Sequence, residues 1–282
     1  MKITIIIPVY NEQAHIEHML GSLVGQTIKP SQVIIVDDNS TDNTPSIIKK
    51  YVDTYPWITA VNTHKTSKHS PGAKVIEAFY KGYEKCDLDA QLIGKFDADI
   101  ILPSNYLEKM VAIFASDNLV GIASGNLYIK KRDAWIFENI SEKTKVRGPI
   151  KLYKKECFEA IGGLKKSIGW DTVDGLLAAF HGWKTKTDPL LHVKHLKATG
   201  NAYTSGAKHK QGEAFYKMRY SKTLTRIAAL KLAVSKKDPL FYLHCMQGYN
   251  ISKKQKQPFI VSQQEGEFIR NFRWKAIKKK IL

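Results

Sequence analysis

The chain has 282 residues, 43% of them hydrophobic, and carries a formal net charge of +18. A chain of this length and hydrophobic content can bury a full core, which excludes a disordered protein. No apolar run approaches about 18 residues, and the run after Met1 is too short and too early for a signal peptide, so no membrane-spanning helix is expected.

The positive charge is concentrated toward the C-terminal end. Residues 205–282 contain 18 Lys and Arg against 4 Asp and Glu, a net charge of +14, whereas residues 1–204 contain 26 against 22, a net charge of +4. We therefore predict a domain over 1–204 and a basic extension over 205–282. Such a basic region favours a polyanionic partner, either nucleic acid or an anionic membrane surface, although a solvated surface is the simpler alternative.

The cysteines point to the cellular compartment. Cys86, Cys157 and Cys245 are widely spaced, odd in number and without metal-ligand spacing. This pattern is typical of reduced thiols, so we expect a cytoplasmic protein, with the inner face of the plasma membrane as its site if the basic extension binds lipid. Nothing in the sequence determines the oligomeric state.

Four buried strands are predicted in the first hundred residues, because short β-branched runs recur there. A helix is expected after each of the first three, and Asn11 is placed to cap the first helix. The strands are Ile3–Val9, Gln32–Val36, Ile58–Val61 and Leu92–Phe96, and the helices begin near Glu12, Thr41 and Gly72. This alternation predicts an α/β fold with a mostly parallel, three-layer sheet.

The rest of the chain is predicted to mix helices and strands and then to become helical. The expected helices begin after Pro103 and cover Lys154–Ile161 and Thr172–His181, and a strand is expected at Leu190–His195. The Gly-, Ser- and Thr-rich stretch Ala198–Gly212 is predicted to be a mobile loop that closes over bound substrate. Beyond it the chain is basic and helical, ending in Glu265–Leu282.

Two carboxylates one residue apart, Asp97 and Asp99, follow the fourth predicted strand. The carboxyl ends of strands are where open α/β sheets bind ligands. Carboxylates in this position suit a hard divalent cation that also holds phosphate oxygens. The same pattern is common in turns and helix caps, so it gains weight only from its place in the fold.

Five motifs occur in order along the chain: Ile5–Glu12, Val33–Asp42, Asp97 with Asp99, Arg147–Pro149 with Glu159–Leu164, and Trp170–Leu176. Together, over roughly residues 3–197, they resemble family 2 glycosyltransferases of GT-A fold. The resemblance implies an inverting, metal-dependent transfer of sugar from a nucleoside diphosphate donor, with UDP expected, to a hydroxyl acceptor. That acceptor would be a glycan or lipid-linked molecule in cell-surface glycan synthesis. The resemblance also implies a nucleotide-binding half at 1–100 and an acceptor half at 101–204.

The resemblance assigns donor-binding roles in the first half. Asp38 would accept from a uracil N–H or a ribose hydroxyl, and Pro8 and Tyr10 would line the base pocket. Glu12 would reach the nucleotide, and Lys74 would meet donor phosphate or uracil at a helix start. Each has a structural alternative: Asp38 lies in a helix-capping turn, and an acid such as Glu12 is favourable in a first helical turn.

The resemblance also implies a metal site. Asp99 would coordinate Mn²⁺ or Mg²⁺, and Asp97 would contribute to the same site by contacting the ribose or a metal-bound water. His195 falls where relatives supply a third ligand, with His192 as a competitor on the same strand. An imidazole ligand does not decide between the two metals.

An inverting transfer needs a base to take the acceptor's proton. Asp171 aligns with the family's base, and Asp174 is an alternative base or a supporting residue one helical turn away. Here a single Asp stands between Trp170 and Thr172 instead of the commoner Glu-Asp pair. The alternative is that Asp171 only caps a helix.

The last segment, Glu265–Leu282, mixes apolar residues with cations, which suits a membrane interface. Packing on the domain is the alternative, and nucleic acid is disfavoured because no recognition motif accompanies the charge. Two rival functions have distinct signatures. A sugar-phosphate nucleotidyltransferase would need a Gly-rich loop after the first strand, and Val9–Glu12 lacks one. A non-catalytic binding protein on a transferase scaffold would lack the acidic residues, which are present.

Overall fold

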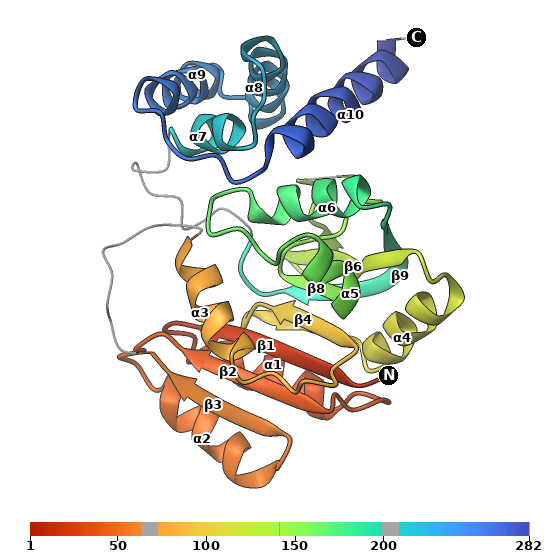
Figure 1. Cartoon of the computed structure of the whole chain (residues 1–282). Coiled ribbons are helices and arrows are strands. Elements are labelled where there is room, and N and C mark those ends of the chain that lie inside the picture. Colours follow the sequence, from red (N-terminus) through yellow and green to blue (C-terminus); the bar gives the residue numbers. More distant parts are fainter. Residues whose placement is uncertain (64–72, 141, 199–208, 282) are drawn as a thin grey trace.

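The computed structural model describes residues 1–63, 73–140, 142–198 and 209–281. One nine-stranded sheet runs through the body in the order β3-β2-β1-β4-β8-β6-β9-β5, and β7 pairs with β6 (Figure 1). The first four strands in the chain are parallel neighbours, as the sequence predicts. They are β1 (Ile3–Val9), β2 (Gln32–Asp37), β3 (Ile58–Asn62) and β4 (Leu92–Phe96).

The second half of the sheet contains the antiparallel pairs. Strand β8 (Ile150–Lys154) joins β4 and β6 (Val120–Lys131) in antiparallel fashion, whereas β6 and β9 (Lys184–His195) are parallel. The short strands β5 (Ile100–Ile101) and β7 (Ala134–Phe137) pair antiparallel to β9 and β6. The pairing of β5 with β9 matters for the site, because it brings the residues after β4 to the end of β9.

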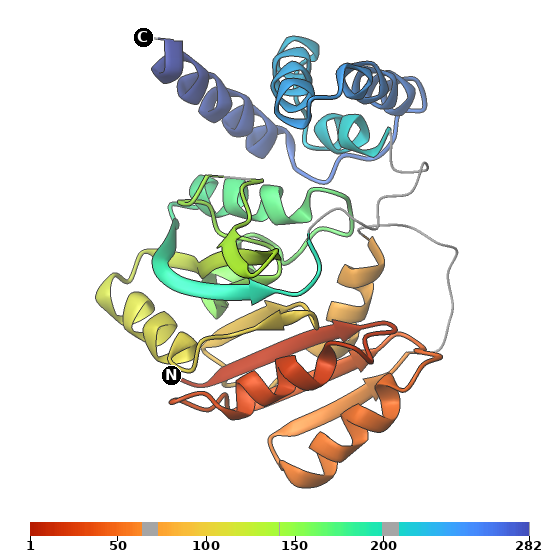
Figure 2. The ribbon, with the colours of Figure 1, turned by 180° about the vertical axis from the view of Figure 1, so that it is seen from behind.

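Helices cover both faces of the sheet, which gives the predicted three layers. On one face, α1 (Ile16–Val24), α2 (Thr44–Thr54) and α4 (Tyr106–Ser116) share a core with the first strands (Figure 2). On the other face lie α3 (Ala73–Tyr83), α5 (Lys155–Ala160) and α6 (Trp170–Phe180). The central strands β1, β2 and β4 are buried on both faces because their apolar runs have no polar side, as expected for parallel strands, whereas the edge strand β3 is largely exposed.

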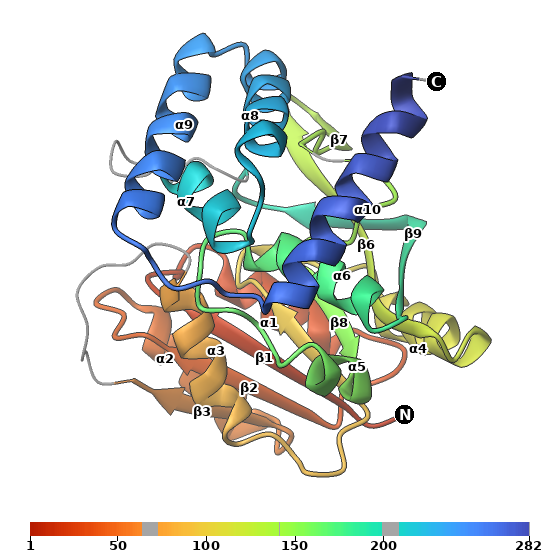
Figure 3. The same ribbon diagram turned by 45° about the horizontal axis from the view of Figure 1, so that its top comes forward.

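The C-terminal region is helical, as predicted. It consists of α7 (Lys210–Lys217), α8 (Lys222–Lys236), α9 (Pro239–Lys254) and α10 (Gln263–Ile281). Helices α7, α8 and α9 pack together, and α10 lies against α6 and α8 (Figure 3). Buried residues of these helices belong to the same apolar cluster as α3, α5 and α6, so the extension is docked on the body.

Two local predictions differ from the structure. The first helix begins at Ile16 and not near Glu12, because Asn11 adopts a left-handed φ of +52° and its side chain accepts from the amide of Thr41 instead of capping a helix. The last body strand begins at Lys184, six residues before the predicted Leu190, since it continues along β6.

The predicted mobile loop over Ala198–Gly212 lies largely outside the described residues, which omit 199–208. Its last three residues belong to α7. Within the described part of the chain, the helices are all too short or too polar to cross a bilayer.

Candidate functional site

The loops after β1 and β2 are tied to each other at the carboxyl edge of the sheet. The amide of Asp38 donates to the Val9 carbonyl at 2.8 Å, and the amide of Thr41 donates to Asn11 Oδ1 at 2.8 Å. The Asp38 carboxylate accepts a 2.6 Å hydrogen bond from Thr63 Oγ1 at the end of β3. These bonds hold Asp38, which is half-buried, in a defined position beside β1.

The two predicted base-pocket residues follow the same strand end. Pro8 is half-buried within β1, and Tyr10 is 52% exposed just after it. Lys74 is half-buried in the first turn of α3, where described residues resume after position 72. The exposed Tyr10 ring and the fixed Asp38 carboxylate, at neighbouring strand ends, suit the binding of a nucleotide base. In the described contacts, neither Pro8 nor Tyr10 touches Asp97 or Asp99.

Glu12 connects the two ends of the body. Its carboxylate accepts from Lys197 Nζ at 2.6 and 2.7 Å, and His15 Nδ1 lies 3.1 Å away. Its backbone amide donates to Thr44 Oγ1 at 2.8 Å. The ion pair links the loop after β1 to the segment after β9, so this carboxylate already has a cationic partner within the protein.

Asp97 and Asp99 meet His195 because β5 pairs with β9. Ile100 is in register with His195, and the amide of Leu196 donates to the Asp99 carbonyl at 2.8 Å. His195 Nε2 then lies 3.7 Å from Asp99 Oδ1. Burial, the Asp97 carboxylate and Glu12 raise the pKa of Asp99 to about 6, against the opposing effect of His195 and Lys197.

The buried Glu138 contacts the Nδ1 side of the His195 ring, and the buried Arg147 contacts Glu138 in turn. Glu138 Oε2 lies 3.4 Å from His195 Nδ1 and accepts from Arg147 Nη2 at 2.7 Å. Burial lowers the pKa of His195, but the hydrogen bond that its Nδ1–H donates to Glu138 and the Asp99 charge outweigh this effect and raise the pKa overall. Such a partner on the second ring nitrogen orients an imidazole ligand. The competing His192 is exposed and stacks on Tyr128, with ring centroids 4.1 Å apart.

Sequence reasoning missed Glu138, whose only signal is that it follows β7. It also missed two buried lysines, Lys95 and Lys151, which are register neighbours across β4 and β8. Lys95 pairs with Asp97, and both ammonium groups lie over the Trp170 ring, at 5.0 and 5.7 Å from its centroid. The available signal was a lysine inside an otherwise apolar strand.

Asp174 and Asp171 lie in different environments although they are one helical turn apart. Asp174 is buried, accepts from Lys151 Nζ at 2.7 and 2.8 Å, and also accepts from the Tyr153 hydroxyl. These contacts occupy both carboxylate oxygens with donors. A carboxylate so engaged is suited to support the site and not to remove a proton from substrate.

Asp171 has an exposed side chain in the first turn of α6. The N-cap residue of α6 is Gly169, two positions before Asp171, and no side-chain hydrogen bond caps the helix. Asp171 is therefore not its cap. Although Asp171 reaches the surface, the dense protein around the start of α6 partly desolvates its carboxyl and raises the pKa, with Lys151 opposing the shift. Gly148 leaves room for it, since a Cβ there would stand 3.2 Å from the Cβ of Asp171.

The donor set at the acidic cluster fits a divalent cation only in part. Across the described residues, no group of three or more His, Cys, Asp or Glu side chains is arranged to hold a metal. Asp99 and His195 nevertheless face each other in a spot where negative charge accumulates, as the raised pKa of Asp99 indicates. Two protein donors suffice for a cation that completes its shell with phosphate oxygens and water.

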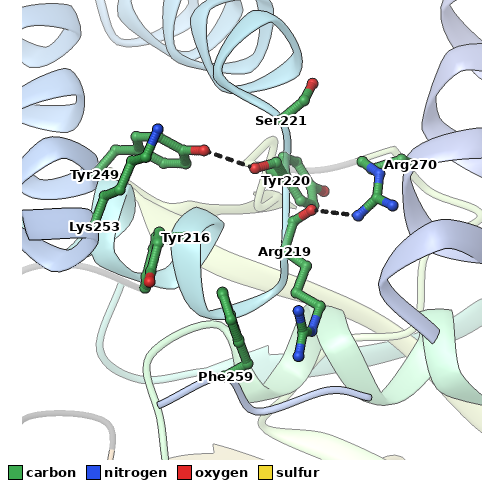
Figure 4. A pocket seen from close by; sticks show the side chains of 8 residues that line it. All are labelled: Tyr216, Arg219, Tyr220, Ser221, Tyr249, Lys253, Phe259 and Arg270. Atoms are coloured by element: carbon green, nitrogen blue, oxygen red, sulfur yellow. Dashed lines mark hydrogen bonds between the residues drawn. The ribbon is translucent and has the colours of Figure 1, made fainter. Parts of the chain in front are cut away.

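Two hollows lie elsewhere. One of about 470 Å³ occurs in the helical region, and two of its cations, Arg219 and Arg270, are held by other contacts (Figure 4). Arg270 donates to the Arg219 carbonyl at 3.0 Å, and the Arg219 guanidinium lies 3.7 Å from the Phe259 ring centroid. The other, of about 570 Å³, lies beside α3. Neither contains a strand-end carboxylate, so the acidic cluster defines the candidate site. The first is lined by Tyr216, Arg219, Tyr220, Ser221, Tyr249, Lys253, Phe259 and Arg270.

Comparison with known proteins identifies the family of this chain. The family model for glycosyl transferase family 2 matches residues 4–164. The chain is 29% identical over 177 residues to an uncharacterized glycosyltransferase of Mycoplasma pneumoniae, which covers 58% of this chain and 57% of that protein. It is 26% identical over 218 residues to the dolichol-phosphate mannosyltransferase of Pyrococcus furiosus, which covers 73% and 57%.

A third relative is the minor teichoic acid biosynthesis protein GgaA of Bacillus subtilis, 28% identical over 166 residues, covering 57% of this chain and 36% of that one. The matches thus span between 36% and 57% of the length of these curated relatives.

Solved structures share the fold at low sequence identity. A mannosyltransferase from Pyrobaculum calidifontis in complex with GDP-Man and Mn²⁺ has a TM-score of 0.59 and 17% identity, covering 98% of this chain and 80% of that one. Residues 1–349 of S. aureus TarS in complex with UDP-GlcNAc have a TM-score of 0.58 and 18% identity, covering 78% and 65%. The predicted GT-A fold is confirmed.

Proposed function

This chain belongs to glycosyl transferase family 2, and from that membership we propose that it moves a sugar from a nucleoside diphosphate donor, with UDP as the nucleotide, to a hydroxyl acceptor with inversion. The observation that carries the proposal is the separation of two kinds of carboxylate. Asp99 lies beside His195, whereas Asp171 is exposed on α6 with a raised pKa. A donor site and a proton acceptor are the two elements that inverting transfer requires.

The donor is proposed to bind along the ends of β1, β2 and β4. Asp38, held by Val9 and Thr63, would accept from a base N–H or a ribose hydroxyl. Tyr10 and Pro8 would contact the base, and Lys74 would approach the phosphates from α3. Glu12 is better suited to fix Lys197 near the donor than to touch the nucleotide, because its carboxylate is already paired.

Asp99 and His195 would hold Mn²⁺ or Mg²⁺, with Asp97 contributing through the ribose or a metal-bound water. Bound there, the cation would offset the negative charge on the departing nucleoside diphosphate. Glu138 fixes the ring of His195 by its hydrogen bond to Nδ1, leaving Nε2 turned toward Asp99. Lys95 would balance the Asp97 charge whenever the cation is absent.

Asp171 is proposed to remove the proton from the acceptor hydroxyl. Its raised pKa makes it a stronger base than an ordinary aspartate. Lys151 and Asp174 would keep the first turn of α6 in place, since Lys151 donates to the Asp171 carbonyl at 2.6 Å and also pairs with Asp174. The acceptor is proposed to be a glycan or lipid-linked molecule, in line with the biosynthetic names of two relatives.

Turnover of a panel of nucleotide sugars in the presence of Mn²⁺ tests the proposal directly. Asp171→Asn is expected to lower kcat by about 10²–10⁴-fold while donor affinity stays nearly unchanged. Asp99→Asn, or excess EDTA with the parent protein, is expected to abolish turnover and weaken nucleotide binding. Asp53→Asn, which removes an exposed carboxylate on α2, serves as the matched control.

Donor affinity that falls with Asp171→Asn as far as kcat would make this residue a donor ligand or a structural residue. Full turnover in excess EDTA would remove the metal from the mechanism. Nucleotide-sugar binding without any turnover would favour the non-catalytic alternative, and formation of nucleotide sugar from sugar phosphate would favour the nucleotidyltransferase.

A further inference from the structure

Exposed apolar side chains gather on two helices far from the sheet. Among the residues that the structure describes, sixteen large hydrophobic side chains are more than a third exposed, and six of them lie on α8 and α9. The strongest cases are Val234 at 72%, Leu230 at 59%, Leu240 at 58% and Leu243 at 53%. Scattered exposed apolar residues are ordinary, but a cluster on adjacent helices is a sign of an interaction surface. The six are Ile227, Leu230, Val234, Leu240, Leu243 and Ile251.

The spacing of these residues aligns them along the outer side of each helix. Positions 227, 230 and 234 fall on one side of α8, and positions 240, 243 and 251 on one side of α9, because three- and four-residue steps return to the same face. The opposite sides are buried, with Thr225 and Ala229 on α8 and Cys245 and Tyr249 on α9. Helices α8 and α9 lie side by side at the end of the molecule away from the sheet (Figures 1 and 3).

Cations frame this α8–α9 face. Arg226, Lys231, Lys236 and Lys237 are exposed on or just after α8. Among the described residues of the four C-terminal helices, one ion pair occurs, between Lys217 and Glu213 on α7. The four cations on or just after α8 have no carboxylate partner there. Lys236 also lies over the Phe241 ring, 5.1 Å from its centroid. An apolar stripe framed by cations without carboxylate partners combines the two attractions that bind a protein to an anionic bilayer.

We propose that the α8–α9 face docks on the surface of an anionic lipid bilayer. The leucines and valine enter the boundary between headgroups and acyl chains, and the lysines and arginine contact the lipid phosphates. The proposal concerns where the protein sits, and it stands whether or not the sugar transfer proposed above is correct.

Other occupants fit this face less well. A second copy of the chain would bring two surfaces of the same positive sign together, which opposes association. A nucleic acid would pair with the cations but leave the exposed leucines in water. The sequence placed the membrane contact on the last helix, α10, but Ile269 is buried there and Phe268 packs edge-to-face against Phe180 with centroids 5.5 Å apart. Much of the apolar side of α10 is therefore used in packing on the body.

Vesicle co-sedimentation of the full chain tests the docking face. Vesicles of phosphatidylcholine alone are compared with vesicles of equal parts phosphatidylcholine and phosphatidylglycerol. The parent protein is expected to bind the anionic vesicles, and added salt is expected to weaken the binding. The triple variant Leu230→Gln, Val234→Gln, Leu243→Gln is expected to lose at least about tenfold in partitioning, and glutamine keeps the helix propensity high.

A matched control removes equally exposed apolar residues from the body. Leu88 and Leu190 are 92% and 84% exposed, so Leu88→Gln with Leu190→Gln is expected to leave vesicle binding unchanged. A second variant, Arg226→Gln with Lys231→Gln and Lys236→Gln, is expected to abolish the preference for anionic over neutral vesicles. Circular dichroism and donor turnover with a water-soluble acceptor are expected to match the parent in every variant.

The proposal is overturned if the triple variant binds anionic vesicles like the parent, or if the control loses as much. It is also overturned if sedimentation velocity shows that the triple variant dissociates an oligomer while vesicle binding is unchanged, which would assign the face to a second copy. Binding to a DNA duplex in place of vesicles would assign the cations to nucleic acid.

Discussion

The body and the C-terminal helices use charged residues in opposite ways. In the body, buried cations are matched one to one with carboxylates: Arg147 with Glu138 and Lys151 with Asp174. In the C-terminal helices most of the described cations are exposed, and most have no carboxylate partner among the described ion pairs. Charge in the body therefore positions side chains of the site, whereas charge in the helices is available to a partner outside the chain.

The largest expected effect in this comparison of the body with the C-terminal helices is at Asp174. Asp174→Asn leaves the Lys151 ammonium buried without its countercharge, so we expect the free energy of unfolding to fall by about 3–5 kcal/mol. Urea unfolding measures it. The control is the same substitution three residues earlier, Asp171→Asn, where the exposed side chain should change stability by no more than about 0.5 kcal/mol. Equal losses of unfolding free energy in the two variants would mean that the buried Lys151–Asp174 pair contributes no more to stability than the exposed carboxylate.

Glu138 tests whether a buried pair positions the site. Glu138→Gln removes the charge behind His195, so Mn²⁺ affinity is expected to fall roughly 10–100-fold, as is usual when the partner of a ligating histidine is lost. Isothermal titration with Mn²⁺ in the presence of nucleoside diphosphate measures this affinity. Glu156→Gln, an exposed acid on α5, is the control. Unchanged Mn²⁺ affinity in Glu138→Gln would mean that the role of Glu138 is limited to its ion pair with Arg147.

The third test is the pH dependence of transfer. Asp171 acts as a base only when ionised, and its raised pKa shifts the loss of activity to higher pH than for an ordinary aspartate. As pH falls below that pKa, kcat is expected to drop about tenfold per unit. The pH profile of kcat measures it, with the residual activity of Asp171→Asn expected to lack this acidic limb. An acidic limb in the ordinary aspartate range would show that Asp171 is well solvated.

The smallest effect is expected from the exposed cations. Arg226→Gln with Lys231→Gln should change the free energy of unfolding by no more than about 0.5 kcal/mol in the absence of lipid, because solvated surface charges contribute little. Thermal unfolding at low and high salt measures this. A loss well above about 1 kcal/mol would show that these cations have partners in the fold, which would weaken the contrast between the two regions.

Part of the site could be predicted from sequence because its positions are local. Asp38, Asp97 and Asp99 each follow a β-branched strand, and the carboxyl ends of parallel strands share one edge of a sheet. The position of Asp171 near the start of a helix followed from the same kind of pattern. The roles of these residues remain proposals, but their places in the fold needed no long-range information.

The sequence alone determined the order of strands and helices up to the fourth strand, the α/β class and the concentration of charge near the C-terminus, since these depend on periodicity and composition. Only the tertiary structure decided which charged side chains become neighbours. Lys95 and Lys151 are neighbours because of the β4–β8 register, and Glu12 meets Lys197 across 185 positions. The exposure of the α8–α9 face likewise depended on where α7 and α10 pack. Such contacts are set by register and docking, which have no signature in a local stretch of chain.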